Sequence, residues 1–205
     1  MAIGDAYATA AQYKAQTGKT GSADDTPLGL ALTAVSRVID RACRRSRTGF
    51  NKDAAAVIRE FNPDFSSAVL PVGDLVSVTA ITVDTALAGT YATTVAETDY
   101  ELLPLNAADG PEVRPYDEIG LLPWSASLKL WVPGQRVKVN AVWGWNAVPA
   151  AITTACIELT AILRLESPRG TNTINELNQV LSTSRVAQNI LAELIETYAR
   201  PPGVG

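Results

Sequence analysis

The stretch LPVGDLVSVTAITV, Leu70–Val83, decides the fold. Its second half, Leu75–Val83, alternates β-branched and small residues, which predicts a strand with one face turned to a core. The preceding Pro71–Asp74 contains the proline and glycine that are typical of turns, so we expect this strand to begin only at Leu75. The segment therefore predicts a β region in the middle of the chain.

Further β-branched stretches surround this one and extend the β region. Turn signals separate them, among them Ala88–Gly89 and Pro133–Gly134, whereas Leu105–Pro123 is rich in proline and is predicted to be a long loop. The expected strands are Val57–Phe61, Tyr91–Val95, Asp99–Leu103, Ser127–Val132 and Gln135–Trp143. Together they predict an antiparallel sheet.

Helical patterns flank the sheet on the N-terminal side. Asp5 can cap a short helix that runs through Gln16 and ends at Gly18. A second helix is expected to start with Thr26 as the N-cap and Pro27 as its first residue, and to end at 48–49. Its apolar stripe has helical spacing and consists of Leu28, Leu32, Val35, Ile39 and Ala42.

Two more helical patterns follow the sheet. Pro149 opens a helix that reaches about Glu166 and is apolar on nearly every side, which predicts burial on two faces. The segment 171–184 is polar and weakly periodic, and the last helix carries the stripe Val186, Ile190, Leu194 and Tyr198. The fold class is therefore α+β: N- and C-terminal helices form a small helical bundle, with a central antiparallel β-sheet insertion. The parts are 1–50, 51–146 and 147–205, expected to form one structural domain.

Composition removes several kinds of chemistry. Among its 205 residues the chain has no histidine, so no imidazole base, Ser-His-Asp or Cys-His nucleophile, or His metal ligand can be built. The two cysteines, Cys43 and Cys156, lie in apolar helical patterns and are expected to be buried free thiols in a reducing compartment. We expect no cofactor and no metal. Without a signal peptide or a membrane-spanning segment, the chain is expected to be a soluble cytoplasmic product.

Two short motifs resemble ligand-binding sites, but their residue spacing does not match those sites. Gly18-Lys19-Thr20 lacks the first glycine of a phosphate-binding loop, because Tyr13 stands there, and it follows a helix rather than a strand. We interpret it as part of a linker. The acidic pairs Asp24-Asp25 and Asp117-Glu118 do not match a calcium loop and are explained by helix capping and turns.

Two clusters have a structural and a functional interpretation. One holds five of the 17 basic residues: Arg37, Arg41, Arg44, Arg45 and Arg47. It is either a solvated helix face paired with acids or a cationic surface for a polyanion or an acidic partner, in a chain whose net charge is −4. The other consists of Trp124, Trp131, Trp143 and Trp145, which form either an aromatic core under the sheet or a subunit interface.

Three segments in this order carry a resemblance to a known family. They are Leu70–Val83, Asp99–Pro104, and Val137–Trp145 followed by Val148-Pro149 and an alanine-rich helix. With the arginine-bearing N-terminal helix they resemble the head-to-tail connector, or adaptor, proteins of tailed bacteriophages and gene transfer agents. The resemblance covers about Thr26 to Leu165, and the segments 105–123 and 171–184 match no motif of that family.

The resemblance implies a structural, non-enzymatic protein of the virion neck that assembles in the host cytoplasm. The family forms a ring of about a dozen copies under the portal protein, above a stopper or tail-completion protein, and lets DNA pass with transient non-specific contact. Membranes play no part. The resemblance implies that the Arg37–Arg47 helix lines or flanks the DNA channel, and it makes Ser184–Arg200 a candidate segment for docking on the portal.

Two other function classes remain open. One is an enzyme or small-ligand module that works with carboxylates, lysine or tyrosine in place of histidine. The other is a different phage neck or tail-completion protein. Sparse positive charge on an acidic body suits a channel through which DNA slides, because many phosphate contacts would bind the DNA tightly.

Overall fold

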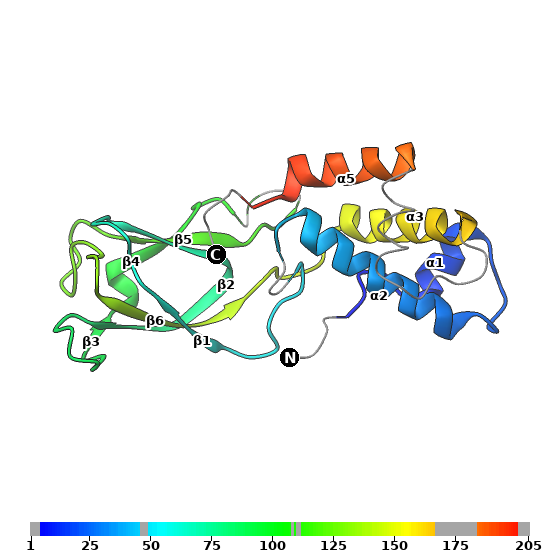
Figure 1. Cartoon of the computed structure of the whole chain (residues 1–205). Helices are drawn as coiled ribbons and strands as arrows, with labels where there is room; N and C mark the ends of the chain where they lie inside the picture. The colour runs from blue at the N-terminus through cyan, green and yellow to red at the C-terminus, as the bar shows by residue number, and fades with distance from the viewer. Residues whose placement is uncertain (1–4, 46–48, 108, 110–111, 167–183, 201–205) are drawn as a thin grey trace. The chain divides into compact units, whose positions relative to one another are not determined.

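The computed structural model describes residues 5–45, 49–107, 109, 112–166 and 184–200. The chain divides into two compact units. The helical unit combines the two ends of the chain, Met1–Phe50 and Val148–Pro201, and the sheet unit is the intervening Asn51–Ala147. The fold is therefore mixed α+β, with a sheet unit inserted between two helical segments (Figure 1).

The sheet unit is a single six-stranded antiparallel sheet. Its strands follow the order β1-β6-β2-β5-β4, and β3 pairs with the free side of the second half of β2. Their bounds are β1 Val57–Phe61, β2 Val69–Asp84, β3 Thr93–Val95, β4 Tyr100–Leu103, β5 Tyr116–Leu121 and β6 Arg136–Trp143, with a short 3₁₀ helix, η1, at Glu97–Asp99. The predicted antiparallel sheet is confirmed.

The core of this unit lies on one face of the β2–β6 ladder. Every second residue of β6 is buried, from Val137 to Trp143, as its sequence alternation predicts. Across the ladder Ile81 is paired with Val139 and Val83 with Val137, and all four side chains are fully buried. Each such side chain contributes about 1.5–3 kcal/mol when it leaves water, so this ladder is the main apolar support of the sheet.

The predicted turn at Pro71–Asp74 is wrong, because these residues belong to β2. The strand absorbs them through an irregular register between Pro71 and Leu75 against β5, where Gly73 has a φ of 80°. Proline is tolerated at such a bulge because no ladder hydrogen bond is required from it. β2 therefore pairs with β5 through its first half and with β3 through its second half, while β6 lies along the other side.

Two predictions for the region after β4 are wrong as well. The expected loop 105–123 contains β5, an interior strand, and the expected strand Ser127–Val132 is irregular chain with one isolated bridge, between Trp131 and Ser67. Asp99 explains the second error: its carboxylate accepts the N–H groups of Ala126 and Ser127 at 3.2 and 3.1 Å, and also the Ser127 hydroxyl. These bonds, led by that of the Ser127 hydroxyl, lower the pKa of Asp99.

The helical unit begins with a short capped helix, α1, Ala10–Thr17. Asp5 is not its cap. Thr9 is, because its hydroxyl accepts the Gln12 N–H while the Gln12 side chain accepts the Thr9 N–H, the reciprocal pair of a capping box. The helix ends at Gly18 in the left-handed conformation, as predicted.

Three longer helices complete this unit: α2 Asp25–Ala42, α3 Ala150–Glu166 and α5 Arg185–Tyr198. α2 begins one residue before the predicted Thr26 cap and ends well before residue 48. Its predicted stripe is buried from Leu28 to Ile39, and it packs against α3, while α5 packs on both (Figure 1). α3 is buried along Ile152, Cys156 and Leu159, and no helix among the described residues is long and apolar enough to cross a membrane.

Gly144 offers a test of how the sheet unit is closed. It has a φ of 103°, and a Cβ there would collide with the carbonyl oxygen of Asn51 and lie 2.9 Å from the Cα of Lys52. We expect Gly144→Ala to lower the free energy of unfolding by about 3 kcal/mol or more, since backbone atoms must shift in addition to the unfavourable φ. Chemical denaturation followed by tryptophan fluorescence measures this.

Gly134→Ala is the matched control. Gly134 has a φ of 84°, but a Cβ there meets nothing within 4 Å. Only the conformational cost of about 1 kcal/mol is expected. Equal losses in the two variants would show that the close approach of Asn51 to Gly144 is unimportant.

Candidate functional site

The arginine cluster lies where α2 ends. The helix stops at Ala42 because Arg44 turns into the left-handed region, with a φ of 55°, and the Arg45 N–H then donates to the Asp40 carbonyl at 2.7 Å. Cys43 caps the helix with its N–H bonded to the carbonyl of Ile39. The cluster is therefore divided between two elements: Arg37 and Arg41 lie on α2, and Arg44 and Arg45 lie in the turn that follows it.

A buried polar network fills the space beside this turn. The Tyr7 hydroxyl donates to Asp40 and accepts the N–H of Phe50 at 2.8 Å. The Arg37 Nε lies 3.2 Å from the other carboxylate oxygen of Asp40. Gly49 has a φ of 60°, and a side chain at this position would collide with both Tyr7 and Asp40. Position 49 therefore requires glycine.

Burial governs the acid–base behaviour of the network. Loss of water around Asp40 raises the pKa of its carboxyl, although the Tyr7 hydroxyl and the arginines Arg37 and Arg45 act in the opposite direction. Burial and the nearby Asp40 likewise raise the pKa of Tyr7. Because the pKa of Tyr7 is raised above its ordinary value of about 10, its hydroxyl keeps its proton at neutral pH and serves as the hydrogen-bond donor to Asp40.

Arg45 anchors the C-terminal helix. Its side chain is only 7% exposed in this structure, its Nε donates to the Tyr198 carbonyl at 3.0 Å, and its guanidinium lies 5.2 Å from the centre of the Phe50 ring. The Arg200 N–H donates to the Cys43 carbonyl at 3.2 Å. The end of α2 and the end of α5 are thus joined through backbone carbonyls at the last turn of each helix.

The structure separates the five predicted arginines. Arg45 is buried and cannot contact a partner, which corrects its assignment as a DNA or acidic-partner residue. Arg37 is half-buried against Asp40, and Arg47 lies outside the described residues. Arg41 and Arg44 are exposed. Of the four predicted arginines that the structure describes, these two retain a surface for an anionic partner.

The tryptophans are also separated. Trp131 and Trp143 are fully buried in the sheet core, and Trp145 is 2% exposed. Trp143 packs between Phe61 and the Arg59 guanidinium, which lies 4.4 Å from its ring centre. These three are core residues rather than interface residues. Trp124 is 71% exposed and is the one of the four that can contact another chain.

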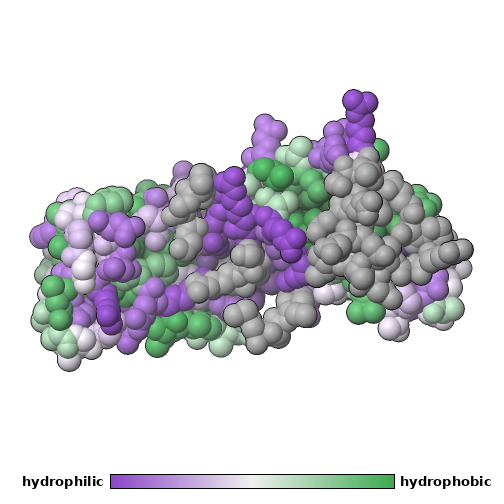
Figure 2. All heavy atoms as spheres, viewed as in Figure 1, coloured by the Kyte–Doolittle hydropathy of each residue, from purple (hydrophilic) through white to green (hydrophobic). Residues whose placement is uncertain are grey.

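The apolar stripe predicted on α5 is buried at its C-terminal end and exposed at its N-terminal end. Leu194 and Tyr198 are buried in the helical unit, where the Tyr198 ring packs edge-on against Phe50, so they are not available for docking. Ile190 is half-buried, whereas Val186 is 61% exposed. Figure 2 shows apolar surface over α5 between hydrophilic side chains.

The thiols are inert in this structure. Cys43 and Cys156 are buried and free, as expected. Burial raises the pKa of Cys43 to about 11 and raises that of Cys156, so neither is a thiolate at neutral pH. Among the described residues no group of histidine, cysteine and acidic side chains is arranged to hold a metal ion.

Sequence reasoning missed the residues that hold the arginine turn. Tyr7, Asp40 and Phe50 are far apart in the sequence, and no spacing relates them. The one local signal was Asp40 itself, a carboxylate three residues after Arg37 on the same helix. A comparison with protein-family models finds no match to this chain, and a comparison with curated proteins finds none either.

The anchoring role of Arg45 predicts a difference between two neighbouring arginines. Arg45→Ala removes a buried charged donor from the Tyr198 carbonyl, so we expect a loss of about 2–3 kcal/mol in the free energy of unfolding. Arg41→Ala changes an exposed side chain and should stay within about 0.5 kcal/mol of the parent. Thermal and denaturant unfolding compare them, and equal effects would contradict the anchor.

Asp40 gives a pH dependence with a defined sign. Because its pKa is raised in the folded state, the folded protein holds a proton that the unfolded chain releases, and stability from this group falls as pH rises above 3.8. Asp40→Asn keeps an oxygen acceptor for Tyr7 but does not titrate. We expect the wild type to lose stability relative to this variant as pH rises from 3.8 through the raised pKa; a constant difference would refute this.

Proposed function

We propose that this chain is a structural head-to-tail adaptor of a tailed phage. In this proposal it forms a ring of about a dozen copies under the portal, joins the capsid to a stopper or tail-completion protein, and lets DNA pass. In this proposal the chain acts by contact with other proteins and not by catalysis. It works in the virion neck after assembly in the host cytoplasm.

The observation that carries the proposal is the order of the segments that resemble the adaptor family. Leu70–Val83, Asp99–Pro104 and Val137–Trp145 contribute the strands β2, β4 and β6 of one inserted sheet. The arginine-bearing helix α2 precedes the sheet, and the alanine-rich helix α3 follows it. We infer that the helices α1, α2, α3 and α5 make a small bundle that serves as the body of the ring.

The charge distribution supports a channel that DNA can slide through. Arg41 and Arg44 are exposed, whereas Arg37 is paired with Asp40 and Arg45 is buried. Each phosphate contact adds to the affinity for DNA, so the two exposed arginines of this cluster attract it weakly in each copy. In this proposal Arg41 and Arg44 face the DNA, and their positive charge makes the affinity for DNA fall as the salt concentration rises.

Exposed apolar side chains support contacts with other proteins. Trp124 in the sheet unit is 71% exposed, and Val186 on α5 is 61% exposed. Tryptophan is among the residues that most often carry binding energy in an interface, and covering an exposed valine removes apolar surface from water. We assign Trp124 to the contact between copies and Val186 to the contact with the portal.

The decisive experiment mixes the purified chain with the portal protein of the same phage. Negative-stain microscopy should show collars on the portal, and crosslinking with mass spectrometry should find the chain in intact particles. The chain alone can stay monomeric until it meets the portal, so the mixture is the informative sample. An absence of any assembly with the portal, together with an absence from particles, would overturn the proposal.

Val186 gives a sharper test of portal docking. Val186→Ser removes an exposed apolar side chain from α5 and should weaken portal binding about tenfold, since covering a valine side chain contributes about 1.5–3 kcal/mol. Leu30→Ser on α2 is the matched control, because Leu30 is 64% exposed in the same unit. Affinity is measured by biolayer interferometry, and equal weakening by both variants would contradict docking through α5.

A further inference from the structure

A cavity of about 500 Å³ opens in the helical unit beside the loop between α1 and α2. Its walls come from three elements: α1 with Lys14, the loop with Gly18, Lys19, Thr20 and Gly21, and α3 with Arg164. The start of α2 closes it, with Asp24 and the side chain of Leu28. The lining is mixed, because Tyr13 and Leu28 add apolar surface to these charged side chains.

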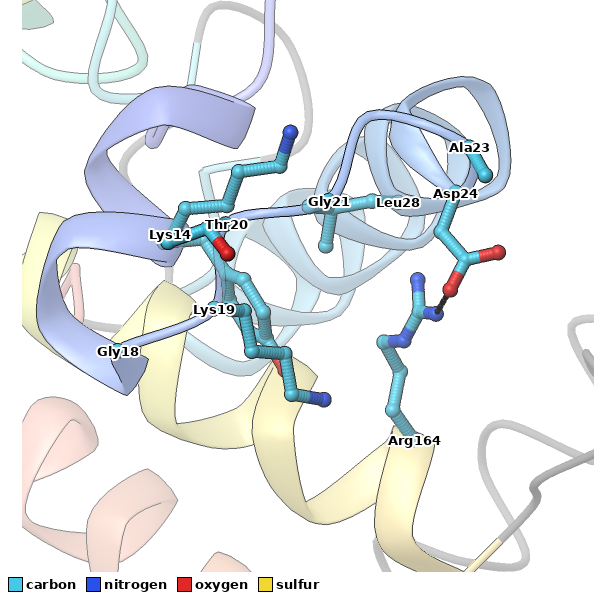
Figure 3. A pocket seen from close by; sticks show the side chains of 10 residues that line it. Lys14, Gly18, Lys19, Thr20, Gly21, Ala23, Asp24, Leu28 and Arg164 are labelled. Atoms are coloured by element: carbon cyan, nitrogen blue, oxygen red, sulfur yellow. Dashed lines mark hydrogen bonds and ion pairs between the residues drawn. The ribbon is translucent and has the colours of Figure 1, made fainter.

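Three cations and one carboxylate line this pocket. Lys14 forms an ion pair with Asp25, and Arg164 forms one with Asp24 at 3.1 Å. Lys19 has no ion pair with any carboxylate in the described part of the chain, and its Nζ lies 5.9 Å from the centre of the Tyr13 ring. In Figure 3 Lys19 and Arg164 lie on either side of the opening, and the Lys14 amine points away from both.

The local charge therefore exceeds what the carboxylates neutralise, in a chain whose net charge is −4. A guanidinium and an ammonium that flank one opening suit a ligand with several anionic oxygens, because arginine binds two oxygens at once and lysine adds a mobile point charge. The Thr20 hydroxyl lies in the same wall and can donate a further hydrogen bond. Such a donor set matches a phosphate group better than a single carboxylate.

The Asp24 carboxylate binds the Arg164 guanidinium at the position where such an anionic ligand would bind. Its carboxylate is 74% exposed and makes no capping hydrogen bond to α2, so it is held by Arg164 alone among the described contacts. An incoming anion would compete with it for the guanidinium. This differs from a phosphate-binding loop, where backbone N–H groups cradle the phosphate.

We propose that this pocket binds a phosphate group between Lys19 and Arg164, with Asp24 as the internal competitor. The phosphate belongs either to a free small anion or to a nucleic-acid strand, and the two sources share the same contacts. The site goes beyond the proposed adaptor function, because phosphate binding by the isolated chain needs neither a ring nor a portal.

The test uses the full chain labelled with ¹⁵N and titrated with inorganic phosphate and, separately, with a short single-stranded oligonucleotide. Saturable chemical-shift changes at residues 18–24 are expected at constant ionic strength. Lys19→Ala and Arg164→Gln should each weaken phosphate binding about tenfold, since each removes a charge-assisted hydrogen bond. Arg41→Ala, an exposed cation of the same unit outside the pocket, should leave it unchanged.

Asp24→Asn separates this proposal from a general attraction of anions to lysine. Because the Asp24 side chain makes no capping hydrogen bond to α2, the helix should persist in this variant, while loss of the competing charge should strengthen phosphate binding severalfold. Tighter binding of the oligonucleotide than of phosphate, lost in Lys19→Ala, would assign the nucleic-acid source. An absence of saturable shifts, or equal weakening in Arg41→Ala and Lys19→Ala, would overturn the pocket and leave the adaptor proposal untouched.

Discussion

The antiparallel contact between Lys52 and Gly144 is the constraint on which the organisation of the chain depends. The two residues form a β-bridge, and the Asp53 N–H donates to the Trp143 carbonyl at 2.8 Å. The chain therefore enters and leaves the sheet unit on neighbouring backbones. Because the two ends of the insertion are fixed side by side, a long segment can form the sheet unit while the two ends of the chain form one helical unit. Glycine is required at 144 because any side chain would occupy the space of Asn51.

The helical unit has its own tie, at the end of α2. Here burial assigns different tasks to neighbouring arginines that look equivalent in the sequence. Arg45 donates to the last turn of α5, Arg37 balances the buried Asp40, and Arg41 remains in solvent. A buried arginine needs acceptors that cancel its desolvation, and the Tyr198 carbonyl is one of them. The same turn therefore both anchors the C-terminal helix and leaves two cations, Arg41 and Arg44, at the surface.

Local periodicity explains which elements the sequence could predict. β6 was found within one residue because its buried and exposed residues alternate without interruption. β5 was missed because Tyr116–Leu121 contains two acidic residues and a glycine, and only its pairing with both β2 and β4 makes it a strand. Ser127–Val132 has the composition of a strand, but Asp99 accepts the Ser127 N–H at its start, and the segment forms one isolated bridge, from Trp131 to Ser67. The buried network at Tyr7 and the pocket at Lys19 depend on tertiary contacts, which no sequence spacing records.

The ion pairs of the helical unit bear on how such a chain could meet a polyanion. Lys14, Arg37 and Arg164 are each matched by a carboxylate, from Asp25, Asp40 and Asp24 respectively. An anion must displace or share these carboxylates before it gains the full charge of the cation, so the attraction is weaker than the number of basic residues implies. Weak and replaceable contacts are what a passing DNA strand requires, because a strand held at many phosphates would not slide. The acidic composition of the chain is therefore compatible with contact to DNA, provided that the unmatched cations are few and lie where the strand passes.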